Sequence, residues 1–192
     1  FRRHEVLFEN IGEISTVSGP WARMPAYFGL QPPLQPFGRV ASTYGHANFE
    51  ADFDDVFRRQ PLIAKSSQLL AEYDLNDLTP QTEVDTENYQ RLVWFDRDTR
   101  PHTVEAPLTS EVLENLRQEM AERAPARAVD LDNDGEADEE TYTVRLYQDH
   151  FIPAVTLSLA LQYFNKTLED VEVVIGSHVR IPDPQQFDAE TG

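Results

Sequence analysis

An acid-rich stretch at residues 130–140, which reads DLDNDGEADEE, is where residue types and spacing could do chemistry. Its acids alternate with other residues ahead of a glycine, Gly135. Calcium takes about six to eight oxygen ligands, and alternating carboxylates around a tight turn can bring oxygens to one point. The sequence predicts a structural calcium ion (Ca²⁺) bound by Asp130, Asp132, Asp134, Glu136 (through its carbonyl) and Asp138. The alternative is a solvated acidic hairpin tip.

The residues that follow decide which kind of calcium loop this could be. A helical EF-hand needs a glutamate at position 12 of the loop and a helix after it, but here position 12 is Thr141, where a strand pattern begins. The pattern DxDxDGxxD without that glutamate resembles the calcium loops of integrin-type β-propeller repeats and similar bacterial and archaeal loops. That resemblance implies a local site between two strands and does not bear on the fold.

Other patterns of catalytic or metal-binding residues are absent from the sequence. It contains no cysteine, which excludes disulfides, zinc–thiolate sites and thiol catalysis. The five histidines have no metal-binding spacing, and there is no nucleophile elbow, phosphate-binding glycine loop or dinucleotide fingerprint. We therefore expect no enzyme and no small-molecule substrate. An N-glycosylation sequon at Asn165 suits a secreted or surface protein.

The composition is that of a folded but very acidic protein. A chain of 192 residues with 40% hydrophobic content can form one domain with a sizeable core. Its net charge of −18 would repel nucleic acid. Lys65 and Lys166 are its two lysines, and all other basic residues are arginines. This composition resembles that of proteins from extreme halophiles, since molar salt screens such repulsion; the alternative is an acidic mesophilic protein from a GC-rich genome.

Neither a membrane span nor a signal peptide is visible in the sequence. The apolar runs are shorter than the ~18 residues that a membrane helix requires, and no signal-peptide pattern opens the chain. Because the sequence begins at Phe1 and not at methionine, we expect that a preceding segment has been removed. A targeting signal could have been lost with that segment.

The elements that would position these residues are predicted to be mostly strands. Apolar residues alternate with polar or small ones, or form short runs, in the following segments: 6–8, 49–53, 92–95, 141–146, 155–163, 171–175 and 179–181. A turn or bulge is expected at 176–177. Residues 110–124 predict a helix, with Ser110 as its cap and Pro125 after its end. A second, weaker helical pattern covers 62–73.

These elements predict a mainly β fold, an antiparallel jelly-roll-like sandwich or barrel with one or two short helices in the connections. We expect a single domain over 1–192, with an aromatic- and proline-rich loop at 19–38 and a polar C-terminal tail at 182–192. The loop either covers one end of its own barrel or contacts a neighbouring subunit, and both roles can hold together. Its candidate interface residues are Trp21, Tyr27, Phe28 and Phe37.

In size, class and acidic, cysteine-free surface, the chain resembles the small single-jelly-roll major capsid proteins of haloarchaeal icosahedral viruses that enclose a membrane. The predicted strands near 4–17, 89–95 and 141–181 carry this resemblance. It implies a structural virion protein that associates with copies of itself and with a second capsid protein, close to an internal membrane. The rival hypothesis is a secreted or cell-surface calcium-dependent β-sandwich of a halophile, for adhesion or sugar binding.

Overall fold

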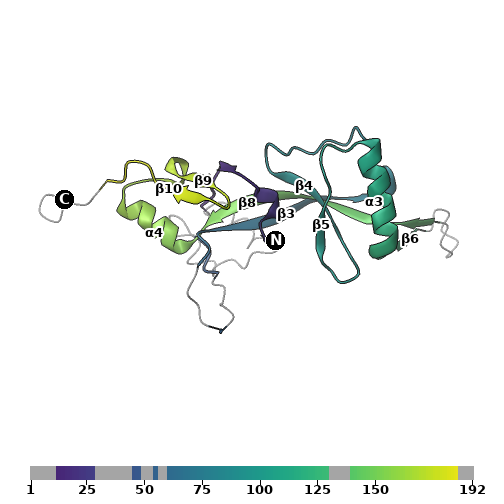
Figure 1. Cartoon of the computed structure of the whole chain (residues 1–192), viewed down its shortest axis with the longest axis horizontal. Helices are drawn as coiled ribbons and strands as arrows, with labels where there is room; N and C mark the ends of the chain where they lie inside the picture. The colour runs from purple at the N-terminus through teal and green to yellow at the C-terminus, as the bar shows by residue number, and fades with distance from the viewer. Residues whose placement is uncertain (1–11, 29–44, 49–53, 56–59, 130–138, 186–192) are drawn as a thin grey trace, which may run out of the picture. The chain divides into compact units, whose positions relative to one another are not determined.

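The computed structural model describes the following residues: 12–28, 45–48, 54–55, 60–129 and 139–185. The chain divides into two compact units, which we call the first unit (Phe1–Ser66 with His150–Gly192) and the second unit (Ser67–Asp149). Two long strands, β3 (Ile63–Asp74) and β8 (Thr143–Pro153), contribute residues to both units (Figure 1). That 1–192 forms one domain stays a prediction.

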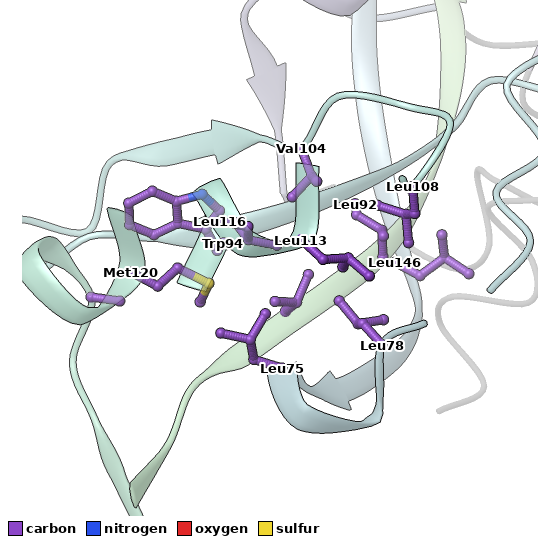
Figure 2. Packing of buried hydrophobic residues seen from close by; sticks show 12 residues of the cluster. Leu75, Leu78, Leu92, Trp94, Val104, Leu108, Leu113, Leu116, Met120 and Leu146 are labelled. Carbon is purple, nitrogen blue, oxygen red and sulfur yellow. The ribbon is translucent and has the colours of Figure 1, made fainter. Parts of the chain in front are cut away.

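The second unit consists of a sheet covered by a helix. Strand β4 (Gln90–Phe95) pairs antiparallel with both β8 and β5 (Pro101–Thr103), within a five-stranded sheet of order β2-β3-β8-β4-β5. Helix α3 (Ser110–Arg123) contributes to the same buried cluster as the sheet. Figure 2 shows how the side chains of this cluster meet, among them Leu92, Trp94, Val104, Leu113, Leu116, Met120 and Leu146.

Local sequence explains why α3 forms where it does. Its buried residues, Leu113, Leu116 and Met120, recur at helical spacing and therefore share one face. The hydroxyl of Thr109 accepts a hydrogen bond from the amide of Val112 at 3.2 Å, so Thr109 is the N-cap. The predicted helix is confirmed, but its cap lies one residue before Ser110. The remaining short elements of this unit are η2 (Leu75–Asp77), β6 (Arg127–Val129) and β7 (Glu139–Thr141).

The first unit contains short strands and a second helix. These elements are β1 (Val17–Ser18), η1 (Trp21–Arg23), β2 (Ala26–Tyr27), α4 (Val155–Tyr163), η3 (Leu168–Asp170), β9 (Glu172–Val174) and β10 (His178–Arg180). Strand β9 is antiparallel to β10 and parallel to β1, while β2 is parallel to β3. The β9–β10 turn uses Gly176, whose φ of +78° favours glycine, and the amide of Ser177 donates to the carbonyl of Val174.

The predicted wealth of strands is confirmed, but the fold is mixed α/β, with two α-helices among the described residues. The strands predicted at 92–95, 141–146, 171–175 and 179–181 correspond to β4, β7 with β8, β9 and β10. Those predicted at 6–8 and 49–53 lie outside the described residues. The sheets are not all antiparallel, and within the described ranges none closes into a barrel. The jelly-roll arrangement stays a prediction.

Two elements differ from their predictions. Residues 155–163 form helix α4 and not a strand. The weaker helical pattern at 62–73 is also wrong, because 63–74 form strand β3. In both cases tertiary packing decides between patterns that the local sequence leaves ambiguous.

Candidate interaction surface

Trp21, the first of the predicted interface residues, packs within the first unit. Its ring meets Phe151 edge to face, with centroids 6.3 Å apart, and the Lys65 ammonium lies 5.8 Å from the ring centroid. Lys65 is itself fully buried and donates hydrogen bonds of 3.1 Å to the carbonyls of Trp21 and Ala22. Trp21 is therefore half-buried, and its contacts with Phe151 and Lys65 lie within the first unit.

The other predicted interface residues have different environments. Tyr27, at the end of β2, and Phe28 after it are exposed, with relative exposures of 39% and 38%. Phe37 lies outside the described residues. Of the predicted set, Tyr27 and Phe28 are therefore the two that the structure places at the surface of the first unit.

Helix α4 presents an apolar surface that the sequence analysis missed. Its inner face buries Leu157, Ser158 and Leu161. Its outer face exposes Val155, Leu159 and Tyr163, the last two with relative exposures of 60% and 63%. These three are spaced four residues apart, so they form one ridge along the helix. The strand predicted at 155–163 would have placed all five of its large apolar residues on one buried face. For this reason the sequence did not predict an exposed apolar ridge.

A second exposed apolar pair, Leu69 and Leu70, lies on β3 in the second unit. Hydrogen bonds from Ser67 to Asp149 and from Arg145 to Glu72 link this strand to β8.

A buried polar cluster in the second unit connects β3, β4 and β8. The Nε of Arg91 donates to a carboxylate oxygen of Asp149 at 2.6 Å, and the relative exposures of the two side chains are 7% and 0%. The same guanidinium donates to Ser67 at 3.0 Å and to Thr103 at 3.2 Å. The acid thus has both a charged and a neutral partner in the protein interior, and the cluster exposes no reactive group.

A second polar cluster connects β4 and β5 to the C-terminal end of α3. The carboxylate of Asp96 lies 3.0 Å from the Nε2 of His102 and accepts hydrogen bonds from the amides of Arg100 and Asp98. The hydrogen bond with His102, and then that from Arg100, lowers the pKa of Asp96. His102 stacks on Trp94 with centroids 4.4 Å apart, and Arg123 also approaches this ring.

The predicted calcium ligands, Asp130, Asp132, Asp134, Glu136 and Asp138, all lie outside the described residues. What the structure shows is that the strands on either side of them pair, with Val129 opposite Glu139. Within the described ranges, no three His, Asp or Glu side chains are grouped so as to hold a metal ion. The calcium site stays a prediction.

A hollow of about 390 Å³ in the second unit is lined by residues of 80–85 and 107–108. Its ionisable lining residues are the carboxylates Glu83 and Asp85, with no basic side chain beside them. This lining does not form an acid–base or nucleophilic arrangement.

Comparison with protein-family models, with curated proteins and with solved structures gave no match. Neither helix in the described part of the chain is long and apolar enough to cross a membrane. The features that point to a function are the exposed apolar side chains of the first unit and the charge of the chain.

Proposed function

We propose that the protein is a structural subunit that assembles with copies of itself into a shell, as the capsid proteins of halophilic viruses do. The observation that carries this proposal is the set of large apolar side chains exposed on the first unit: Tyr27, Phe28, Leu62, Val155, Leu159 and Tyr163. Apolar side chains that lie together at the surface often mark a contact surface, and Val155, Leu159 and Tyr163 lie together along α4. No catalytic role is part of the proposal.

High salt would allow copies to associate through this apolar surface although each copy is strongly acidic. Copies that each carry −18 repel one another at low ionic strength, which opposes association. At about 1 M salt the Debye length falls to about 3 Å, so the repulsion is confined to direct contacts. Apolar contacts do not depend on charge, and they therefore determine association in brine. The proposal includes a jelly-roll arrangement, location in the virion, a second capsid protein as partner and proximity to an internal membrane.

The native mass of the protein tests this function. Sedimentation velocity in about 1 M salt should show a multimer whose population rises with protein concentration, and about 0.1 M salt should reduce that population. A double variant, Tyr27→Ser with Phe28→Ser, should assemble less while keeping its circular dichroism spectrum. A wild-type protein that stays monomeric in molar salt at every accessible concentration would contradict the proposal.

A calcium-dependent adhesion or sugar-binding domain is the second candidate. The observation that favours it is the β6–β7 pairing, which brings the two ends of the acidic stretch at 130–138 together. A calcium requirement for stability, together with a monomeric native mass, would support this candidate over assembly.

A further inference from the structure

We infer that α4 of one copy packs antiparallel against α4 of a second copy, across a two-fold axis close to Leu159. This inference rests on the proposed function, because it names the surface through which assembly would occur. It concerns only the first unit, in which α4 is placed by its buried residues Leu157 and Leu161.

Helix α4 is apolar on both its inner and its outer side. A helix at the surface of a soluble protein usually has a polar outer face, and a helix that is apolar all round is usually covered all round. On α4, Leu157 and Leu161 face inward while Val155, Leu159 and Tyr163 face outward. The inner side is covered by the first unit itself. The apolar outer side would be removed from water if a partner covered it with apolar side chains.

The absence of charge on α4 favours a copy of the same acidic chain as the partner. Helix α4 reads VTLSLALQY and contains no Asp, Glu, Lys or Arg, although 26% of the whole chain is charged. A basic partner would find no carboxylate to bind here. A second acidic copy can approach this face without placing like charges in contact, whereas elsewhere the excess of acids would oppose it.

The ridge formed by Val155, Leu159 and Tyr163 can pack against a second copy of itself. Ridges formed by residues four apart pack into the grooves of a second helix at a preferred angle near −50°. A two-fold axis makes the same ridge serve both copies. In the antiparallel sense, Leu159 meets its equivalent at the centre, and the large Tyr163 lies beside the smaller Val155. Opposite helix ends, which carry opposite partial charges, then lie side by side.

The size of the contact sets its strength. Nine residues of helix are about 14 Å long, so the pair buries well under the ~800 Å² per partner of a standard stable interface. A single α4 pair should therefore be weak in dilute solution. In an assembly, other contacts hold the copies together and raise the effective concentration of this one.

Cross-linking through one introduced thiol tests the inference directly, since the chain has no cysteine of its own. Leu159→Cys, treated with a short thiol-to-thiol cross-linker in molar salt, should give a covalent dimer that is lost on dilution before the reagent is added. Leu70→Cys is the matched control, because Leu70 is also an exposed leucine but lies in the second unit. It should give several-fold less dimer.

A charge at the centre of the ridge is the second test. Leu159→Glu should lower the multimer fraction in sedimentation, and the neutral Leu159→Gln should lower it less, because only the former brings two carboxylates together on the two-fold axis. Circular dichroism checks that both variants fold. If neither variant folds, the residue is covered by its own chain and the inference is overturned.

The remaining outcomes separate this inference from the proposed function. If the wild type assembles, the Leu159 variants assemble equally well and Leu159→Cys cross-links no better than Leu70→Cys, then α4 is not the interface and the proposed function stands. If the wild type never assembles, both are lost. Binding to neutral lipid vesicles that depends on Leu159, without cross-linked dimer, would assign the ridge to a membrane surface and overturn the inference.

Discussion

Arg91 and Asp149 form a buried ion pair whose loss should destabilise the second unit strongly. Removing one partner leaves the other charge buried and uncompensated, which costs about 3–5 kcal/mol. Arg91→Ala should therefore lower the free energy of unfolding by about that amount in urea titrations at molar salt. Arg127→Ala is the control, because its pair with Asp74 at 2.7 Å is largely exposed and should contribute about 1 kcal/mol or less. Similar losses from both variants would show that the buried pair has no special role.

Asp96 should make stability depend on pH in the acid range. Its hydrogen bond with His102, and next that from the amide of Arg100, lowers its pKa below the ordinary value of 3.8. Since the unfolded chain binds the proton more readily, the stabilisation by Asp96 is complete above about pH 4 and is lost as the pH falls through the lowered pKa. The loss of stability in Asp96→Asn should therefore be largest near neutral pH and should shrink below about pH 4.

Thermal melts of the wild type and of Asp96→Asn between about pH 7 and pH 3, at constant ionic strength, measure this pH dependence. A difference between wild type and Asp96→Asn that stays constant down to pH 3 would contradict the role assigned to the hydrogen bond with His102.

Among the elements, those with local signals were predictable and those decided by packing were not. Helix α3 has a cap, a stripe of apolar residues and a following proline, all of which are visible in sequence. Helix α4 has no side-chain cap, and its alternating leucines also satisfy a spacing of four. Strand β3 buries Ile63 to Ser67 within the sheet, and this burial overrides its helical pattern. The outer ridge of α4 was not predicted, because the same residues also fit a strand with one buried face.

The acidic stretch between β6 and β7 should bind calcium through Asp130, Asp132, Asp134, Glu136 and Asp138. If it does, adding calcium after removal by a chelator should raise the melting temperature at fixed ionic strength, because the ion binds the folded hairpin preferentially. Calorimetry gives the measurement. A double variant, Asp132→Ala with Asp134→Ala, should lose the response. An equal response from wild type and variant would leave the stretch as acidic surface between two paired strands.

For the whole molecule, the charge of −18 predicts that the protein needs salt to stay folded. Lowering the salt from about 1 M to about 0.1 M lengthens the Debye length from about 3 to about 10 Å and strengthens repulsion among the acids. The melting temperature should fall over that range. Neutralising three exposed acids, as in Glu87→Gln, Glu105→Gln and Glu169→Gln, should reduce the dependence. A melting temperature that does not change with salt would contradict the halophilic hypothesis.

The charge follows directly from the composition, and the need for high salt stays a prediction. The arrangement of the sheets depends on contacts between distant segments. The parallel pairing of Val17 with Val173 joins residues far apart in the chain, and no local pattern identifies such a partner. Tyr27 and Phe28 were predicted as interface residues only because they belong to an aromatic- and proline-rich segment. Both are exposed in the structure.

Because Lys65 is buried, the chemical reactivity of its amine should report unfolding of the first unit. The chain has two lysines, of which Lys65 is fully enclosed and Lys166 is half-buried. An amine-acylating reagent should modify Lys166 quickly in the native protein, and should reach Lys65 only when the first unit opens. Peptide mass spectrometry after timed labelling would then measure the opening rate, with equal labelling of both lysines in denaturant as the control. Equal labelling rates of Lys65 and Lys166 in the native protein would contradict the burial of Lys65. If Lys65 is labelled much more slowly, its labelling rate can be used to follow stability at any salt concentration.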